Sequence, residues 1–168
     1  TVRPGPVSPI SAGVPHSFRN MGSEALEMLV IYHPPRKRAP VPAASIKARI
    51  HERRQEAQGV VSLELRPCEG GSLPPFEPGS HIDLHLPDGM VRSYSLCNAS
   101  EDAGRYVIGV QRDRASRGGS VYVHEQLQTG DEIEISRPRN NFPLQLAATH
   151  SVFVAGGIGI TPITSMLR

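Results

Sequence analysis

The chain of 168 residues has only two cysteines and no tryptophan. Cys68 and Cys97 cannot build a disulfide framework or a four-thiolate iron–sulfur site, because such sites need more sulfur atoms. The sequence therefore predicts a protein of a reducing, cytoplasmic compartment. No stretch approaches about 18 consecutive apolar residues, and the first residues lack the charged and apolar regions of a signal peptide. We expect neither a membrane span nor a secretory signal.

Aromatic side chains and lysine are also scarce. Aromatic residues make up 5% of the chain. The basic stretch at residues 36–54 could belong to a barrel that binds single-stranded nucleic acid, but such a site needs aromatic side chains for base stacking. Near this stretch the sequence offers only Tyr32. Nucleic-acid binding stays a weak alternative, and we expect no nucleic-acid partner.

Proline and glycine divide the chain into three parts. Half of the 16 prolines fall within residues 1–45, which predicts a basic, proline-rich and disordered leader. Period-two alternation then predicts six strands, at residues 46–57, 60–66, 81–86, 91–96, 105–112 and 132–136. Closely spaced strands with little helix are typical of a small antiparallel barrel, here at residues 46–147. The class is mostly β.

Two helices are expected beside these strands. The first covers residues 118–127, with Ser120 as its N-cap. Later, the apolar run at residues 151–155 predicts a strand buried on both faces. Thr161 as N-cap and Pro162 at the first helical position then begin the second helix. A strand followed at once by a helix predicts the start of an α/β domain at residues 148–168, which we expect to be truncated.

Glycine-rich turns precede both helices. Gly118 and Gly119 stand before Ser120, and backbone amides at a helix start can bind a phosphate. In the second turn Pro162 occupies the place of the third glycine of the dinucleotide fingerprint, so that fingerprint is incomplete. Each turn taken alone is equally typical of a simple connection between a strand and a helix.

A polar strand face and one cysteine could each carry chemistry, but a simpler interpretation is available for both. His81, Asp83 and His85 share one strand face and could ligate a metal, but this pattern is also that of a strand face in contact with water. No fourth ligand is evident near them, so we expect no metal. Cys97 is interpreted as a small buried residue rather than a nucleophile.

The order of the motifs is more specific than any one of them. The motifs are Arg92, Ser93, Tyr94 and Ser95, then residues 118–120, 137–144 and 155–162. In this order they resemble the ferredoxin–NADP reductase superfamily, most closely its phthalate dioxygenase reductase and vanillate demethylase reductase branch. The resemblance covers residues 45–168. It implies a six-stranded Greek-key flavin-binding barrel with one short helix, followed by the first βα unit of an NAD(P)-binding domain.

The resemblance also implies a role for each motif residue. Arg92 would reach the flavin phosphate, Tyr94 would pack on the isoalloxazine and ribityl, and Ser95 would approach N5 as the catalytic residue. The other flavin-binding residues would be Ser93, Val110, Gln111, Arg112, Gly118, Gly119, Ser120 and Thr161. The residues facing the pyridine nucleotide would be Gly156, Gly157, Gly159, Thr161 and Pro162.

The function implied by the resemblance is that of an NAD(P)H-dependent flavin oxidoreductase. Electrons would pass from NAD(P)H through FMN to an iron–sulfur centre and then to an oxygenase or ferredoxin-type acceptor. FMN is favoured over FAD because no aromatic partner for an adenine follows Ser95. The 2Fe-2S cluster of full-length relatives would have no ligands in this chain. The alternative is a fragment that binds flavin without turnover, since the nicotinamide site is only begun.

Overall fold

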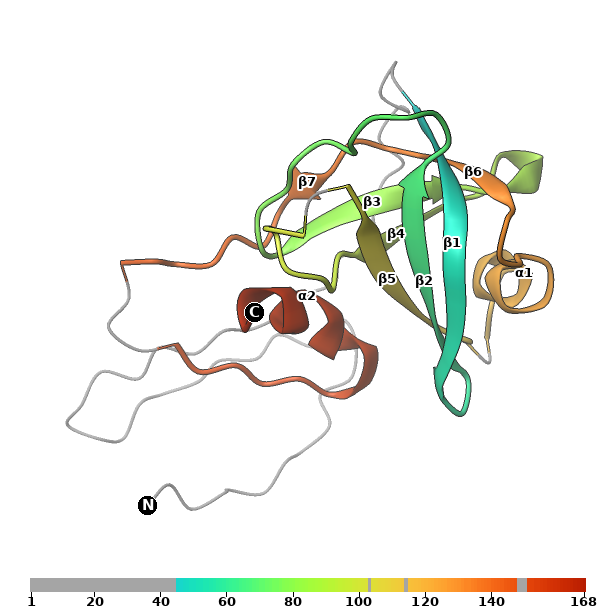
Figure 1. Cartoon of the computed structure of the whole chain (residues 1–168). Coiled ribbons are helices and arrows are strands. Elements are labelled where there is room, and N and C mark those ends of the chain that lie inside the picture. Colours follow the sequence, from blue (N-terminus) through green and yellow to red (C-terminus); the bar gives the residue numbers. More distant parts are fainter. Residues whose placement is uncertain (1–44, 103, 114, 148–150) are drawn as a thin grey trace.

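The computed structural model describes residues 45–102, 104–113, 115–147 and 151–168. The leader predicted for residues 1–45 lies outside these ranges except for Ser45. Strands dominate the described part, and every strand pair in it is antiparallel (Figure 1). The strands are β1 (Ile46–Ala57), β2 (Val60–Pro67), β3 (Ser80–His85), β4 (Val91–Ser95), β5 (Tyr106–Gln111), β6 (Glu132–Ile135) and β7 (Arg139–Asn140).

The six predicted strands are confirmed, each within one residue at either end. The mostly-β class with few helices is confirmed as well. Strand β7 was not predicted, because two residues are too short for an alternation to be visible. It pairs with the start of β3, where Ser80 faces Asn140 and His81 faces Arg139.

The sheet curls into a barrel-like form but does not close. Its strand order is β4-β3-β6-β1-β2-β5, so β4 and β5 are the two edge strands. One isolated bridge, between Leu96 and Ile108, joins these edges, and the amide of Cys97 donates to the Val107 carbonyl at 2.8 Å beside it. Apart from this bridge, the outer edge of β4 has no ladder partner among the described strands.

Alternating apolar side chains form the core between the strands. Fully buried examples on four strands are Ile50, Leu63, Ile82 and Ile108. At one end Tyr106 donates its hydroxyl to the Pro74 carbonyl and makes an edge-to-face contact with Phe76 at 5.7 Å. On β5 and β6 the period-two pattern that predicted the strands is also the pattern of burial.

The face of β3 that was expected to contact water is buried, so this prediction is wrong. His81 exposes 7% of its surface and Asp83 9%. Arg139 is the cross-strand partner of His81, lies on the same face and reaches the Asp83 carboxylate. Alternation shows which residues share a face, but it cannot show that a later segment covers that face.

Both predicted N-caps are also wrong. Helix α1 (Gly119–Glu125) begins after Gly118, and helix α2 (Ile160–Met166) follows directly on the short 3-10 helix η2 (Gly157–Gly159). A second 3-10 helix, η1 (Pro87–Gly89), makes the turn between β3 and β4. Ser120 and Thr161 both lie inside the first turn of their helices, and the Thr161 hydroxyl donates back to the Ile158 carbonyl at 2.9 Å.

Residues 151–156 form no strand, contrary to the prediction for 151–155. Val152 is 59% exposed and Val154 70% exposed. A strand exists only where a neighbour completes its hydrogen bonds, and within the described residues none pairs with this run. Helix α2 is formed as predicted and packs on the sheet on the opposite side from α1 (Figure 1).

Candidate functional site

Strand β4 presents two different faces. In the ladder with β3, Arg92 faces Leu84 and Tyr94 faces Ile82, whose side chains belong to the core. Ser93 and Ser95 face Asp83 and His81 on the other side. Because cross-strand partners point to the same side of a sheet, Arg92 and Tyr94 lie on one face of β4 and the two serines on the other.

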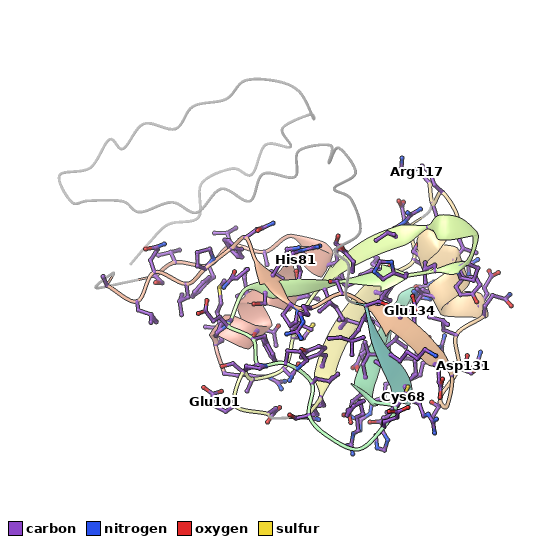
Figure 2. All side chains as sticks on the ribbon, turned by 90° about the horizontal axis from the view of Figure 1, so that it is seen from above. Cys68, His81, Glu101, Arg117, Asp131 and Glu134 are labelled. Atoms are coloured by element: carbon purple, nitrogen blue, oxygen red, sulfur yellow. The ribbon has the colours of Figure 1, made fainter. Side chains whose placement is uncertain are left out.

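Arg92 lies against the start of helix α1. Its Nη2 donates to the Arg117 carbonyl at 3.3 Å, and a Cβ atom built on Gly119 would fall 2.3 Å from its Nε. Gly118 has a φ of 92°, a left-handed conformation that glycine adopts without strain. The structure thus brings Arg92, Gly118 and Gly119 together. In Figure 2 the label of Arg117 marks this end of the β3–β4 pair, and the label of His81 marks the opposite end.

Ser120 has a different task from the predicted cap. Its buried hydroxyl accepts a hydrogen bond from the Asp113 amide at 3.1 Å and donates to Ser116 Oγ at 3.0 Å. The side chain therefore holds the loop before α1. The amides of the helix's first turn have no partner in the helix itself and remain the donors that an anion could use.

Tyr94 and Ser95 lie further along β4. Tyr94 is half-buried and packs against the core, and burial raises the pKa of its phenol, which stays neutral at physiological pH. Ser95 is also half-buried, and its carbonyl accepts a hydrogen bond from the Cys97 thiol at 3.7 Å. Burial raises the pKa of Cys97 to about 11, so the thiol is protonated at neutral pH. The residue as a whole is half-buried rather than buried as predicted.

The end of β5 is tied to α1. Val110 is buried, and its carbonyl bonds His124 Nε2 at 3.0 Å. Gln111 and Arg112 are exposed, and Arg112 pairs with Glu125 of the helix. Because Val110 is enclosed in the core and Arg112 is paired with Glu125, these two would act by shaping the wall, whereas Gln111 is exposed.

The second helix docks at the other end of the site. A Cβ atom on Gly109 of β5 would lie 2.9 Å from Thr161 Cγ2 and 3.9 Å from Cys97 Sγ. Pro162, in the first turn of α2, is buried, while Gly156 and Gly157 are exposed and Gly159 is half-buried. Thr161 therefore meets the sheet beside the Leu96–Ile108 bridge.

The predicted residues fall into two groups joined by β4. One group surrounds the start of α1, and the other surrounds Gly109 and Thr161. Sequence reasoning missed Gly109 and gave neither Asp83 nor Arg139 a role at this site. A glycine inside a strand signals a close approach of another segment, so Gly109 could have been found from that signal, whereas Asp83 and Arg139 meet only through the fold.

Two further kinds of feature are absent from the described part of the chain. No three His, Cys, Asp or Glu side chains in it lie close enough together to hold a metal ion. No helix in it has the length and apolar character needed to cross a membrane. A surface pocket of about 200 Å³ lies on the outer face of β1 and β2, but its Glu64 is already paired with Arg105.

Comparisons with known proteins point to one family. No protein-family model matches the chain. The chain is 54% identical over 121 residues to vanillate O-demethylase oxidoreductase of Pseudomonas putida, covering 72% of this chain and 38% of that protein. It is 45% identical over 123 residues to phthalate dioxygenase reductase of Burkholderia cepacia, covering 73% and 38%.

A solved structure agrees with these relatives. Phthalate dioxygenase reductase, described as a modular structure for electron transfer from pyridine nucleotides to 2Fe-2S, superposes with a TM-score of 0.71 at 44% identity. The match covers 74% of this chain and 39% of that structure. The chain thus spans about two fifths of the length of the relatives it matches. Over the residues that match, the chain belongs to the ferredoxin-reductase superfamily, in the branch of vanillate O-demethylase oxidoreductase and phthalate dioxygenase reductase.

Proposed function

We propose that the chain is the flavin-binding part of an NAD(P)H-dependent oxidoreductase that supplies electrons to an oxygenase. The observation that carries this proposal is the outer edge of β4, which has no ladder partner among the described strands and runs from the Arg92–Gly119 contact to the point where Thr161 meets Gly109. One elongated ligand with an anionic end fits such a site. At one end Arg92 and the start of α1 suit the phosphate of a flavin nucleotide, and further along the strand Tyr94 suits its ring system.

The residues of β4 divide the work of binding. Arg92 and the amides of Gly118, Gly119 and Ser120 would hold the phosphate. The neutral Tyr94 side chain would pack on the ring system, and the backbone of β4 at Ser93 and Ser95 would meet its polar edge. Val110, Gln111 and Arg112 would line the opposite wall, and Thr161 would close the site.

A bound flavin would supply the chemistry of accepting a hydride and releasing electrons singly. Ser95 would lie near the reactive nitrogen, and Gly156, Gly157, Gly159 and Pro162 would face the nicotinamide. We propose residues 46–147 as the flavin domain and residues 148–168 as the start of the NAD(P) domain. The acceptor would be an iron–sulfur centre of an oxygenase or a ferredoxin. The free Cys68 and Cys97 support a cytoplasmic location.

We favour FMN over FAD. An adenine needs an aromatic or similarly flat partner to stack on. Of the aromatic rings in or against the core, Phe76 and Tyr106 are engaged with each other, and Tyr94 is assigned to the flavin ring. The test is a visible absorption spectrum of the purified chain after mixing with excess FMN or FAD and removal of free flavin. Retained colour with FMN supports the proposal, and loss of all colour from a folded sample overturns it.

A second candidate is a chain that binds flavin without turning over NAD(P)H. The exposure of Val152 and Val154 favours it, because the run that should carry the nicotinamide site has no neighbouring strand within the described residues. Steady-state oxidation of NADH with an artificial acceptor separates the two candidates. Saturation by NADH would reject the binding-only candidate.

A nucleic-acid interface has less support. Three arginines of β1 and β2 are engaged by carboxylates, namely Arg49 with Glu132, Arg54 with Glu52 and Arg66 with Glu64. Guanidinium groups neutralised in this way contribute little to phosphate binding. A single-stranded oligonucleotide should therefore show no salt-dependent binding to the chain.

A further inference from the structure

Asp83 is a buried carboxylate in the middle of β3. Ser93 Oγ donates to its Oδ1 at 2.5 Å, and Arg139 Nη2 donates to its Oδ2. The Asp83 amide donates to Ser136 Oγ at 2.9 Å, and the Asp83 carbonyl accepts from the Ser136 amide at 2.9 Å. A buried charge persists only when it is paired and hydrogen-bonded, and here all four polar atoms of the residue are engaged.

The carboxylate is ionised at neutral pH. Burial alone would raise the pKa of Asp83, but the hydrogen bonds from Ser93 and Arg139 and the charge of Arg139 lower it below its ordinary value. Hydrogen bonds to an ionised group are about twice as strong as those between neutral groups. The Ser93 hydroxyl is therefore held more firmly than a hydrogen bond between two hydroxyls would hold it.

Three separate segments meet at this side chain. Asp83 lies on β3, and Ser93 is its direct cross-strand partner on β4. Ser136 directly follows β6, and Arg139 begins β7. Arg139 reaches Asp83 from the position opposite His81. The contact thus links the strand with the flavin motif to the segment that covers the same face of the sheet.

Strand β4 needs such an anchor because it is an edge strand. Its ladder runs only to β3, apart from the bridge at Leu96. Ser93 stands between Arg92 and Tyr94, and neighbouring residues of a strand point to opposite faces. Holding the Ser93 side chain on one face therefore fixes Arg92 and Tyr94 on the other.

We propose that Asp83 is a positioning residue for the flavin site: held by Arg139, its carboxylate fixes Ser93 and with it the rotation of β4 that presents Arg92 and Tyr94. Asp83 touches no part of the ligand itself. The inference rests on the proposed function, since it names a residue that supports the same site.

The test compares flavin affinity in variants that keep the fold. Asp83→Asn removes the charge with little change of shape, and Ser93→Ala removes the hydroxyl. We expect the FMN dissociation constant to rise about tenfold in Asp83→Asn, as for the loss of one charge-assisted hydrogen bond. Ser93→Ala should likewise raise the FMN dissociation constant. Ser93→Thr, which keeps the hydroxyl, should retain wild-type affinity.

Glu64→Gln is the matched control. Glu64 is also 9% exposed and binds two arginines, Arg66 at 2.7 Å and Arg105 at 2.9 Å, but it lies on β2, which is not a neighbour of β4 in the sheet. Its FMN affinity should stay within about twofold of wild type. The visible circular dichroism of the saturated flavin should change in Asp83→Asn and remain unchanged in Glu64→Gln.

Each outcome decides between the alternatives. Equal affinity of wild type and Asp83→Asn, or equal loss in Asp83→Asn and Glu64→Gln, overturns the positioning role. If Asp83→Asn does not fold, Ser93→Ala and Ser93→Thr decide, because the exposed Ser93 tolerates either side chain; equal affinity of these two overturns it as well. If the folded wild-type chain binds neither FMN nor FAD, the proposed function itself fails and the positioning role fails with it.

Discussion

The side chain of Arg92 lies directly on the backbone of Gly119, leaving no space for a Cβ atom: such an atom would come within 2.3 Å of Nε and 2.7 Å of Cγ. A glycine at the first position of a helix is usually a weak choice, since alanine is the better helix former. Here the close approach of the arginine explains it. The same contact sets the position of the guanidinium relative to the amides at the helix start.

Gly119→Ala should therefore separate stability from affinity. We expect the melting temperature to stay within a few degrees of wild type, because better helix propensity offsets part of the crowding. The FMN dissociation constant should rise about tenfold or more as Arg92 is displaced. Fluorescence titration with FMN measures this constant. Gly70→Ala, in a loop position with open space around it, is the control and should leave affinity unchanged.

A second close contact, between Gly109 and Thr161, predicts a compensating pair. Gly109→Ala should destabilise the docking of α2 by about 1–3 kcal/mol, because its new methyl group meets Thr161 Cγ2 at 2.9 Å. Thr161→Ser removes that methyl group and should restore docking in the double variant. The rate of limited proteolysis near residues 151–156 reports docking. A double variant that is cleaved as fast as Gly109→Ala would contradict this explanation.

We expect the ionised Asp83 to make the stability of the fold sensitive to acid. Its folded-state pKa lies below the ordinary value of 3.8, so the ionised form stabilises the fold above that value. This contribution is lost as pH falls through the folded-state pKa. Urea denaturation at a series of pH values from about 6 down to about 3 should show a shallower fall in stability for Asp83→Asn. Glu101→Gln, which changes an exposed carboxylate labelled in Figure 2, should keep the wild-type slope.

We expect the Cys97 thiol to be alkylated slowly. With a pKa of about 11, only roughly one thousandth of the thiol is ionised at pH 8. Iodoacetamide should therefore modify Cys97 far more slowly in the native protein than in urea, where the ordinary thiol pKa returns. Mass spectrometry of the peptide that contains Cys97 measures both rates. Similar rates in the two conditions would show that the thiol is not held in the buried environment described.

The strands were predictable because each carries its own signal. Alternation at Ile82, Leu84 and their counterparts, with glycine and proline between runs, locates the elements without knowledge of the neighbours. Motif order likewise brought Arg92 and Gly119 into one site. What could not be read locally depends on partners: the burial of Asp83 needs Arg139, which comes from a distant segment.

The failed predictions have the same physical origin. Residues 151–155 are apolar enough for a strand, but apolar character does not provide a neighbouring ladder. Thr161 is a good N-cap type, yet the preceding 3-10 turn of η2 runs into α2 and moves the helix start before it. In both cases the local residue preference was correctly identified, and a feature of the adjoining backbone decided the outcome.

The single bridge between Leu96 and Ile108 has a mechanical consequence. Every other strand-to-strand contact along the sheet path is a ladder, so this bridge is the seam at which the curled sheet opens most easily. A ligand lying along β4 and touching β5 would hold the two edge strands together. Binding of the ligand and closure of the sheet would then occur together, and slow hydrogen exchange at the Cys97 amide would report both.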